Sequence, residues 1–304
     1  MLVEAVESYL ALRRSLGYIL DTPASYLRSF AQFASERAET HLAAQTAIDW
    51  ARLSSSAAHR DRRLKIVIRF ARHAHTEDSR HEIPPDGVFG HHGKRRPLPF
   101  IFTPNEIERL IKQAFRLTPT DSLRPYTYGT LFALLSATGM RISEAVNLRL
   151  DDFTPDGLVI RETKFRKSRF LPLHDTVVAG LERYLARRRR LAFNDDHLLV
   201  QHNGRPLCGH TVYCRLRKLA LAAGIEPRPG CPNPRLSSFR HTFAVRALES
   251  CPETRDAIGR HMLALSTYMG HVSVTDTYWY LEATRKLMTD ISKARSAFVK
   301  GQLQ

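Results

Sequence analysis

Two arginines of this chain lie among apolar residues at positions where helices are expected to begin. Arg141 follows a glycine that breaks one helix, and Arg240 opens a second apolar helix together with His241. An arginine in such a place either forms a buried ion pair or binds an anion, because its guanidinium can hold two oxygens of one phosphate or carboxylate. For either arginine alone, the structural ion pair is the simpler interpretation.

Three further residues have side chains that can act on an anion or a hydroxyl group. Lys164 begins a basic turn, His271 follows Gly270, and Tyr280 lies in the aromatic run Tyr-Trp-Tyr. Taken singly, these residues also have ordinary explanations, such as a helix-capping histidine or a core aromatic ring. The order and spacing of all five residues carry more information than any one of them.

Several common enzyme signatures are absent from the sequence. It has no GxxxxGK[ST] phosphate-binding loop, no GxGxxG, no HExxH and no GxSxG. Cys208, His210, Cys214 and Cys231 come nearest to a metal cluster, but their spacing fits no familiar zinc pattern. We therefore expect no metal and no other cofactor, and neither an ATPase nor a dinucleotide enzyme is supported.

The charge balance indicates a polyanionic partner. The chain has 46 Lys and Arg against 30 Asp and Glu, a formal net charge of +16. Residues 1–99 hold 15 basic and 11 acidic side chains, net +4, and residues 100–304 hold 31 and 19, net +12. Both parts are basic, so nucleic acid is the favoured partner, although net charge says nothing about fold.

Length and composition favour a two-domain protein of the cytoplasm. The 304 residues are 43% apolar, enough for real cores, but no run approaches the 18 apolar residues of a membrane span. The N-terminal segment lacks the pattern of a signal peptide. Four cysteines without a CxxC pair make a poor disulfide framework and fit a reducing compartment.

Residues 1–83 are expected to form a helical domain. Thr22 is expected to cap one helix and Thr46 another, and Gly17 to end the first. A fourth helix over 57–75 combines a buried apolar stripe with a row of cations, and it is a candidate for the major groove of B-DNA. Residues 84–100 hold four prolines and three glycines and are expected to be an interdomain linker.

Residues 101–291 are expected to form a mostly helical α/β domain with a small antiparallel sheet. Thr103 opens it with a capping box. Strands are expected over 158–163 and 168–173, joined by the basic turn Lys164–Lys167, with a short strand near 197–201. Helices are expected near 104–117, 125–138, 142–149, 174–190, 210–223, 238–250, 254–269 and 275–290.

The ordered series of five residues resembles the catalytic set of the tyrosine recombinases, the phage integrase family. The segment ATGMRISEAVNL around Arg141 resembles the family's TGxRxSE segment, and FRHTFA around Arg240 resembles LRHTFA. YMGH, followed nine residues after its histidine by Tyr280, resembles LGH…Y, and Lys164 lies where the family carries a lysine in a β-hairpin. The resemblance covers nearly the whole chain and implies a core-binding, SAM-like N-terminal domain.

One position departs from the family pattern. The family usually places His or Lys three residues before its second arginine, and this chain has Ser237 there. Serine cannot replace imidazole as a base near neutral pH. Either His241, His271 or water substitutes, or the rate is reduced, so a weakly active or inactive DNA-binding protein on the same scaffold is the alternative. A relaxing topoisomerase is a third interpretation.

The resemblance implies cleavage and rejoining of DNA strands through a 3′-phosphotyrosyl intermediate, without ATP or metal. Tyr280 would be the nucleophile, and Arg141 and Arg240 would hold the phosphate oxygens. Lys164 would protonate the leaving 5′-oxygen, and His271 would hydrogen-bond the phosphate. Tyr278 competes with Tyr280, but the family spacing favours Tyr280 and leaves Tyr278 to pack inside or to brace the site.

The resemblance also implies the partners. We expect double-stranded DNA with inverted-repeat core sites, a homotetramer on paired sites, a monomer or dimer in the free state, and a host element such as a bacterial transposon. Residues 292–304 are a candidate for docking on a neighbouring protomer. The candidate DNA-binding residues are Arg60, Arg62, Arg63, Lys65, Arg69, Lys94, Arg95, Arg96, Arg166, Lys167, Arg215, Arg217 and Lys218.

Overall fold

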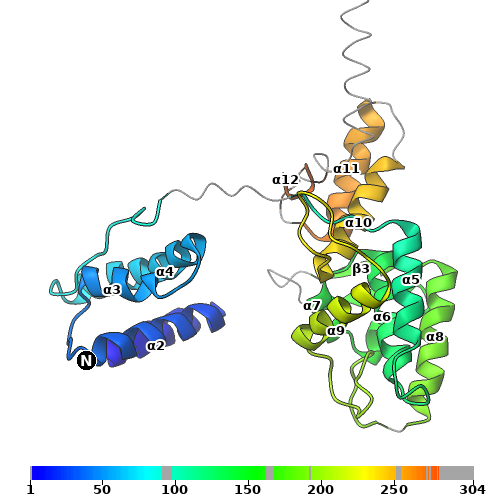
Figure 1. Cartoon of the computed structure of the whole chain (residues 1–304), viewed down its shortest axis with the longest axis horizontal. Coiled ribbons are helices and arrows are strands. Elements are labelled where there is room, and N and C mark those ends of the chain that lie inside the picture. The colour runs from blue at the N-terminus through cyan, green and yellow to red at the C-terminus, as the bar shows by residue number, and fades with distance from the viewer. Residues whose placement is uncertain are drawn as a thin grey trace, which may run out of the picture. The chain divides into compact units, whose positions relative to one another are not determined.

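The computed structural model divides the chain into two units, Met1–Arg95 and Arg96–Gln304 (Figure 1). Both units are built mainly from helices, and a small sheet belongs to the second. The structure describes residues 2–90, 98–161, 168–191, 193–250, 255–271, 273, 275–278 and 280.

The first unit is a bundle of four helices, α1 (Leu2–Ser15), α2 (Asp21–Ser35), α3 (Ala44–Arg52) and α4 (Ala57–Glu77) (Figure 1). Each helix turns an apolar stripe inward, as the 3.6-residue period of its sequence predicts. The fully buried aromatic residues are Phe30, Trp50 and Phe70. Gly17, with φ of +84°, follows the end of α1 as expected.

Two of the expected helix caps in this unit are wrong. Helix α2 starts at Asp21, before Thr22, and no side chain at its N-cap position bonds to the helix. Thr46 lies inside α3, where its hydroxyl donates to the Glu39 carboxylate at 2.5 Å. The free N–H of Ala44 at the start of α3 donates instead to a Glu82 carboxylate oxygen at 2.7 Å. A distant acidic residue therefore does what a local threonine was expected to do.

The second unit begins as the sequence predicts. Thr103 accepts from the backbone N–H of Glu106 at 3.2 Å, and the Glu106 carboxylate accepts from the backbone N–H of Thr103 at 2.7 Å. The helices of this unit are α5 (Pro104–Phe115), α6 (Arg124–Thr138), α7 (Ile142–Asn147), α8 (Asp175–Arg189), α9 (Gly209–Ala222), α10 (Leu236–Glu249), α11 (Arg255–Met269) and α12 (Thr275–Tyr278), with a 3₁₀ turn at Leu150–Asp152.

Among the described residues, the sheet has three antiparallel strands in the order β1 (Phe153–Thr154), β2 (Gly157–Ile160) and β3 (Arg169–Pro172). The two longer strands were expected, and the two-residue β1 is an addition. The strand expected at 197–201 is wrong, because this segment forms only isolated bridges, Arg149 with His197 and Val200 with Pro206. Its apolar run is a buried loop, and burial without pairing produces the same sequence pattern.

Helix α6 runs through the core of the second unit, and its end positions the next element. Phe132 on α6 stacks on Phe239 of α10, with ring centroids 5.6 Å apart. Gly139 ends α6 with φ of +59°, and a Cβ there would lie 2.6 Å from the ring of Phe243. Only glycine fits both the left-handed backbone and the close approach of that ring, so the chain turns sharply and presents Arg141 at the start of α7.

Among the helices that the structure describes, none is long and apolar enough to cross a membrane.

Candidate active site

The site is centred on Arg141, the N-cap residue of α7. Its backbone N–H and its Nη1 each donate to Glu144, one turn into the helix, at 2.8 Å. Its Nη2 donates to the carbonyl oxygen of Gly270 at 3.1 Å. The side chain keeps 27% of its surface exposed, so the guanidinium is oriented by these bonds and still accessible to an anion.

Arg240 lies next to Arg141 but is buried, with 7% of its surface exposed. It lies in the second turn of α10, not at its opening, because the helix begins at Leu236. Its Nη1 donates to Gly139 O at 2.9 Å and its Nη2 to Met269 O at 2.5 Å. Burial and the nearby charge of Arg141 lower the pKa of Arg240 to about 10, which still leaves it charged at neutral pH.

His271 lies two residues after Met269, the last residue of α11. Its Nδ1 is 2.7 Å from the hydroxyl oxygen of Thr277, a fully buried side chain. Burial, together with the charges of Arg240 and Arg141, lowers the pKa of His271 to about 4. The imidazole is therefore neutral at pH 7, and Thr277 holds one of its ring nitrogens.

Tyr280 is buried against both histidines of the region, with 4% of its surface exposed. Its ring is nearly parallel to that of His271, with centroids 6.1 Å apart, and tilted 50° from that of His241 at 5.6 Å. Burial raises the pKa of the Tyr280 phenol, and Arg240 opposes this through its charge and a hydrogen bond. The structure therefore brings four predicted residues together, Arg141, Arg240, His271 and Tyr280.

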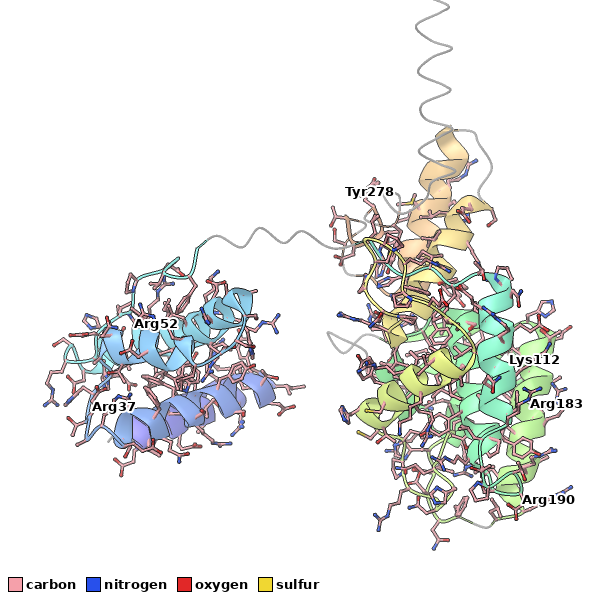
Figure 2. The ribbon with its side chains drawn as sticks, viewed as in Figure 1. Arg37, Arg52, Lys112, Arg183, Arg190 and Tyr278 are labelled. Atoms are coloured by element: carbon pink, nitrogen blue, oxygen red, sulfur yellow. The ribbon has the colours of Figure 1, made fainter. Side chains whose placement is uncertain are left out.

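Tyr278 does not pack inside, contrary to one of the expectations above. Its side chain is 53% exposed, and Figure 2 shows it at the surface of the second unit. Two residues along a helical turn place side chains on opposite sides of the backbone, so a buried Tyr280 turns Tyr278 outward.

Ser237 is exposed on α10, one turn before Arg240. The turn with Lys164, Arg166 and Lys167, the linker residues Lys94, Arg95 and Arg96, and the tail 292–304 lie outside the described residues.

Three residues of the site were not singled out from the sequence: Glu144, Arg169 and Thr277. Glu144 could have been found as the N3 partner of Arg141, because a carboxylate at that spacing can accept from the backbone N–H of the N-cap residue. Arg169 lies two residues before the buried Leu171, hence on the inward face of β3. Its carboxylate partner, Glu144, comes from a different element, which no sequence period reveals.

The basic residues proposed to bind DNA divide into two groups. Arg60 and Arg63 have structural contacts, since Arg60 Nε donates to Ser54 O at 2.7 Å and Arg63 stacks on the Trp50 ring at 3.9 Å. Arg215 is half-buried, with its guanidinium 5.8 Å from the Tyr128 ring centre. The side chains exposed to solvent are Arg62, Lys65 and Arg69 on α4 and Arg217 and Lys218 on α9.

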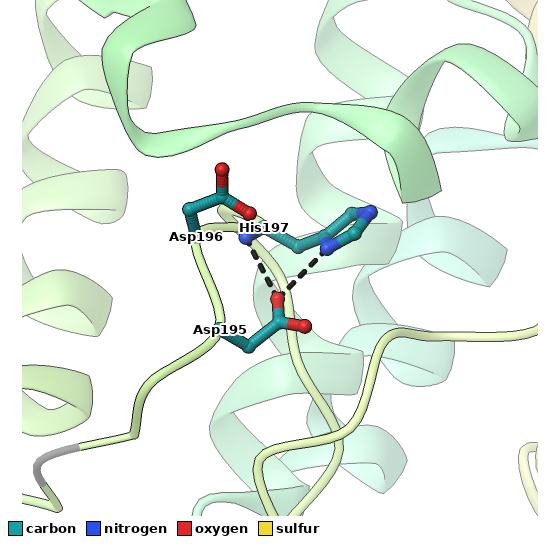
Figure 3. A group of neighbouring side chains, drawn as sticks. All are labelled: Asp195, Asp196 and His197. Atoms are coloured by element: carbon teal, nitrogen blue, oxygen red, sulfur yellow. Dashed lines mark hydrogen bonds and ion pairs between the residues drawn. The ribbon is translucent and has the colours of Figure 1, made fainter.

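Within the part of the chain that the structure describes, one group of side chains has the spacing of metal ligands. Asp195, Asp196 and His197 have ligand atoms within 4.8 Å of one another (Figure 3). Asp195 already accepts from His197 Nδ1 at 2.7 Å, and Asp196 pairs with Arg149. These contacts stabilise the loop before the buried segment 198–200.

The cysteines do not form a ligand set in the described residues. Cys208 and Cys214 are exposed. Cys214 Sγ is 3.5 Å from His210 Nε2, and Cys231 Sγ donates to Pro99 O at 3.9 Å.

Comparison with known proteins places this architecture in a family. The model of the phage integrase family matches residues 101–286. The integrase/recombinase y4rB of Sinorhizobium fredii is 35% identical over 297 residues, 94% of each chain. The tyrosine recombinase XerD of Halalkalibacterium halodurans is 31% identical over 198 residues, 64% of this chain and 60% of that protein.

Two solved structures share the fold over most of the chain. XerH recombinase bound to palindromic difH substrate superposes with a TM-score of 0.65 at 17% identity, covering 90% of this chain and 78% of that one. Tn1549 transposon integrase with circular intermediate DNA also gives 0.65, at 16% identity, covering 97% and 99%.

The fold and the matched sequence define an enzyme that cleaves and rejoins DNA strands. The chain belongs to the phage integrase family, the tyrosine recombinases.

Proposed function

We propose that this chain is a site-specific DNA recombinase whose nucleophile is Tyr280. The observation that carries the proposal is the buried Tyr280 phenol beside Arg240, with Arg141 and His271 directed to the same place. A phosphate bound by the two arginines would lie within reach of the phenol oxygen, the geometry that nucleophilic catalysis requires.

The reaction exchanges one phosphate ester for another. The Tyr280 oxygen bonds to phosphorus, the bond from phosphorus to the 5′-oxygen breaks, and Lys164 supplies a proton to that oxygen. The charge that grows on the phosphoryl oxygens is stabilised by Arg141 and Arg240, which are held in place before the DNA arrives. Because the phosphotyrosyl ester conserves the energy of the broken bond, rejoining needs no ATP.

The phenol proton passes to an imidazole of the site. His241 is the nearer ring to Tyr280, and it stands in for the imidazole that is absent at Ser237. His271 donates from its second ring nitrogen to a phosphate oxygen while Thr277 holds the first.

The binding partner is duplex DNA with inverted-repeat core sites, and both a core-binding domain, residues 1–83, and a catalytic domain, residues 101–291, bind it. Structures of the related fold are recombinase–DNA complexes, among them a lambda integrase dimer on a core site, which supports this partner. A homotetramer on two paired sites, formed from free monomers or dimers, with tail residues 292–304 docked on a neighbour, completes the proposal.

The test is a covalent adduct. A duplex selected by this protein from random sequence is nicked close to the cleavage position, so that the short 5′-hydroxyl strand diffuses away and the adduct accumulates. We expect an SDS-resistant protein–DNA band with wild type and with Tyr278→Phe, and none with Tyr280→Phe. Tyr278 is the matched control because it is an exposed tyrosine two residues away. Binding without any adduct from wild type, or an adduct that persists in Tyr280→Phe, contradicts the proposal.

A further inference from the structure

The C-terminal end of α11 is held by three arginines from three different elements. The contacts are Tyr268 O with Arg169 Nε at 2.9 Å, Met269 O with Arg240 Nη2 at 2.5 Å, and Gly270 O with Arg141 Nη2 at 3.1 Å. The last carbonyls of a helix lack intrahelical partners and carry the negative end of its dipole, so cations stabilise them. Arg141 and Arg240 are the proposed phosphate ligands, whereas Arg169 has no part in the reaction described so far.

Arg169 also holds the carboxylate on which Arg141 depends. Its Nη1 and Nη2 donate to Oε1 and Oε2 of Glu144 at 3.0 and 2.8 Å, a bidentate pair. The Glu144 side chain is 5% exposed and that of Arg169 12%. Bidentate pairs of this kind are the strongest of the charge-assisted hydrogen bonds, and burial shields this one from water.

The pair determines how Arg141 is engaged. With Arg169 on both oxygens of Glu144, the Arg141 guanidinium donates to that carboxylate through Nη1 alone. A buried carboxylate that lost Arg169 would draw Arg141 into a bidentate pair of its own. Arg141 would then turn away from the phosphate, and its charge would be neutralised.

Arg169 is also close to the residues on either side of the site. In the sheet it pairs with Ile160, at the first position of β3. Its guanidinium packs on Gly270, where φ is +64° and a Cβ would lie 3.0 Å from Nη1. The next residue after Gly270 is His271, so one side chain connects β3, the Arg141 cluster and the segment that leads into the histidine.

We propose that Arg169 is a positioning residue for DNA cleavage. It occupies both oxygens of Glu144 so that Arg141 stays directed at the phosphate, and it ties β3 to the end of α11 that leads into His271. The proposal rests on the proposed function, because it assigns a role in that same reaction.

The experiment compares Arg169→Gln and Arg169→Lys with wild type in single-turnover adduct formation at saturating DNA. We expect Arg169→Gln to slow adduct formation by about 10²-fold and Arg169→Lys, which can hold one carboxylate oxygen at a time, by about 10-fold, with the Kd for DNA changed less than about threefold. The matched control is Arg161→Gln. Arg161 directly follows β2, its side chain is 55% exposed, and it pairs with Asp152. It should leave the rate within about twofold of wild type.

A second measurement needs no DNA. The charge of Arg169 contributes to the low pKa of His271, so Arg169→Gln should raise that pKa in an NMR titration while Arg161→Gln should not. The role of Arg169 is overturned if both Arg169 variants form the adduct at the wild-type rate. It is also overturned if the loss of adduct is explained entirely by a higher Kd for DNA. If wild type itself forms no adduct, the proposed function fails, and an unchanged His271 pKa in Arg169→Gln then overturns the positioning role separately. Melting temperatures of each variant set the assay temperature below unfolding.

Discussion

The pKa values of Glu144 and His271 both respond to the cluster of arginines around them. Burial raises the pKa of Glu144, but hydrogen bonds from Arg169 and from the backbone of Arg141 outweigh it and bring the pKa to about 2. Burial and the arginines act in the same direction on His271 and keep it neutral. The site therefore concentrates guanidinium charge on one spot and excludes a further cation, as an anion-binding site requires.

The low pKa of His271 predicts how the stability of the protein depends on pH. Because the pKa of His271 is about 4 in the folded protein and 6.5 without the fold, the unfolded chain binds more protons between these values. Stability from this group is complete above pH 6.5 and is lost as the pH falls towards 4, a loss of roughly 2 kcal/mol after allowance for its partial exposure. Glu144 adds its own loss only below pH 4.5, its unperturbed value.

Urea unfolding of wild type and His271→Gln at several pH values from 4.5 to 7.5 measures this effect. The free energy of unfolding should fall less steeply with decreasing pH in His271→Gln than in wild type. Equal slopes would contradict a low pKa of His271 in the folded protein. His81, whose pKa is also lowered by burial, contributes equally to both proteins and cancels in the comparison.

At the scale of elements, the site depends on where helices end. Gly139 ends α6 and presents Arg141, and Gly270 follows the end of α11 and leads into His271. Each glycine has a positive φ and a neighbouring side chain where a Cβ would be. The carbonyls freed at these ends, Gly139 O and Met269 O, accept from the same arginine, Arg240. Helix termini thus supply both the turns and the acceptors that orient the cations.

Gly139→Ala should therefore lower both stability and cleavage. The left-handed backbone and the 2.6 Å approach to Phe243 predict a loss of about 2 kcal/mol or more, measured by urea unfolding. Gly209→Ala is the matched control, since it lies in the first turn of α9 with open space around the added Cβ. It should be neutral or stabilise by about 0.5 kcal/mol. A Gly139→Ala protein as stable as Gly209→Ala would contradict the packing described here.

Across the whole molecule, the basic side chains that give the net charge of +16 serve different purposes. Arg141, Arg169 and Arg240 serve a single site, and Arg60 and Arg63 serve the internal structure of the first unit. Exposed side chains such as Arg62 and Arg69, seven residues apart on one face of α4, are the proposed contacts to phosphates. Binding of DNA through such side chains releases counterions and weakens with salt.

This division of the arginines predicts different results from alanine substitutions on one helix. Arg62→Ala and Arg69→Ala should each reduce the slope of log Kd against log salt concentration by about 1, without loss of stability. Arg63→Ala should instead destabilise the first unit by about 1 kcal/mol, because it removes the guanidinium stacked on Trp50. Fluorescence anisotropy at several salt concentrations, with urea unfolding beside it, measures both. Equal effects from Arg63→Ala and Arg62→Ala would contradict this assignment.

Much of the fold and half of the site follow from local features of the sequence. The apolar stripe of α4, the capping box at Thr103 and the left-handed glycines depend on residues a few positions apart, and these predictions are confirmed. The cap expected at Thr22 is wrong because α2 already starts at Asp21, and the cap expected at Thr46 is wrong because Glu82, from elsewhere in the chain, binds the start of α3. The prediction of a strand at 197–201 is wrong because a buried loop and a buried strand have the same apolar pattern.

Spacing along the chain is enough to recognise the family and the order of the reactive residues, and the charge count is enough to indicate a polyanionic partner. Which cations act together depends instead on the packing of distant elements. Arg169 and Glu144 are 25 residues apart in the chain, and Arg141 and Gly270 are 129 apart, yet each pair forms a hydrogen bond. Burial, which lowers the pKa of His271 and raises that of Tyr280, is likewise a property of packing between helices that no local pattern records.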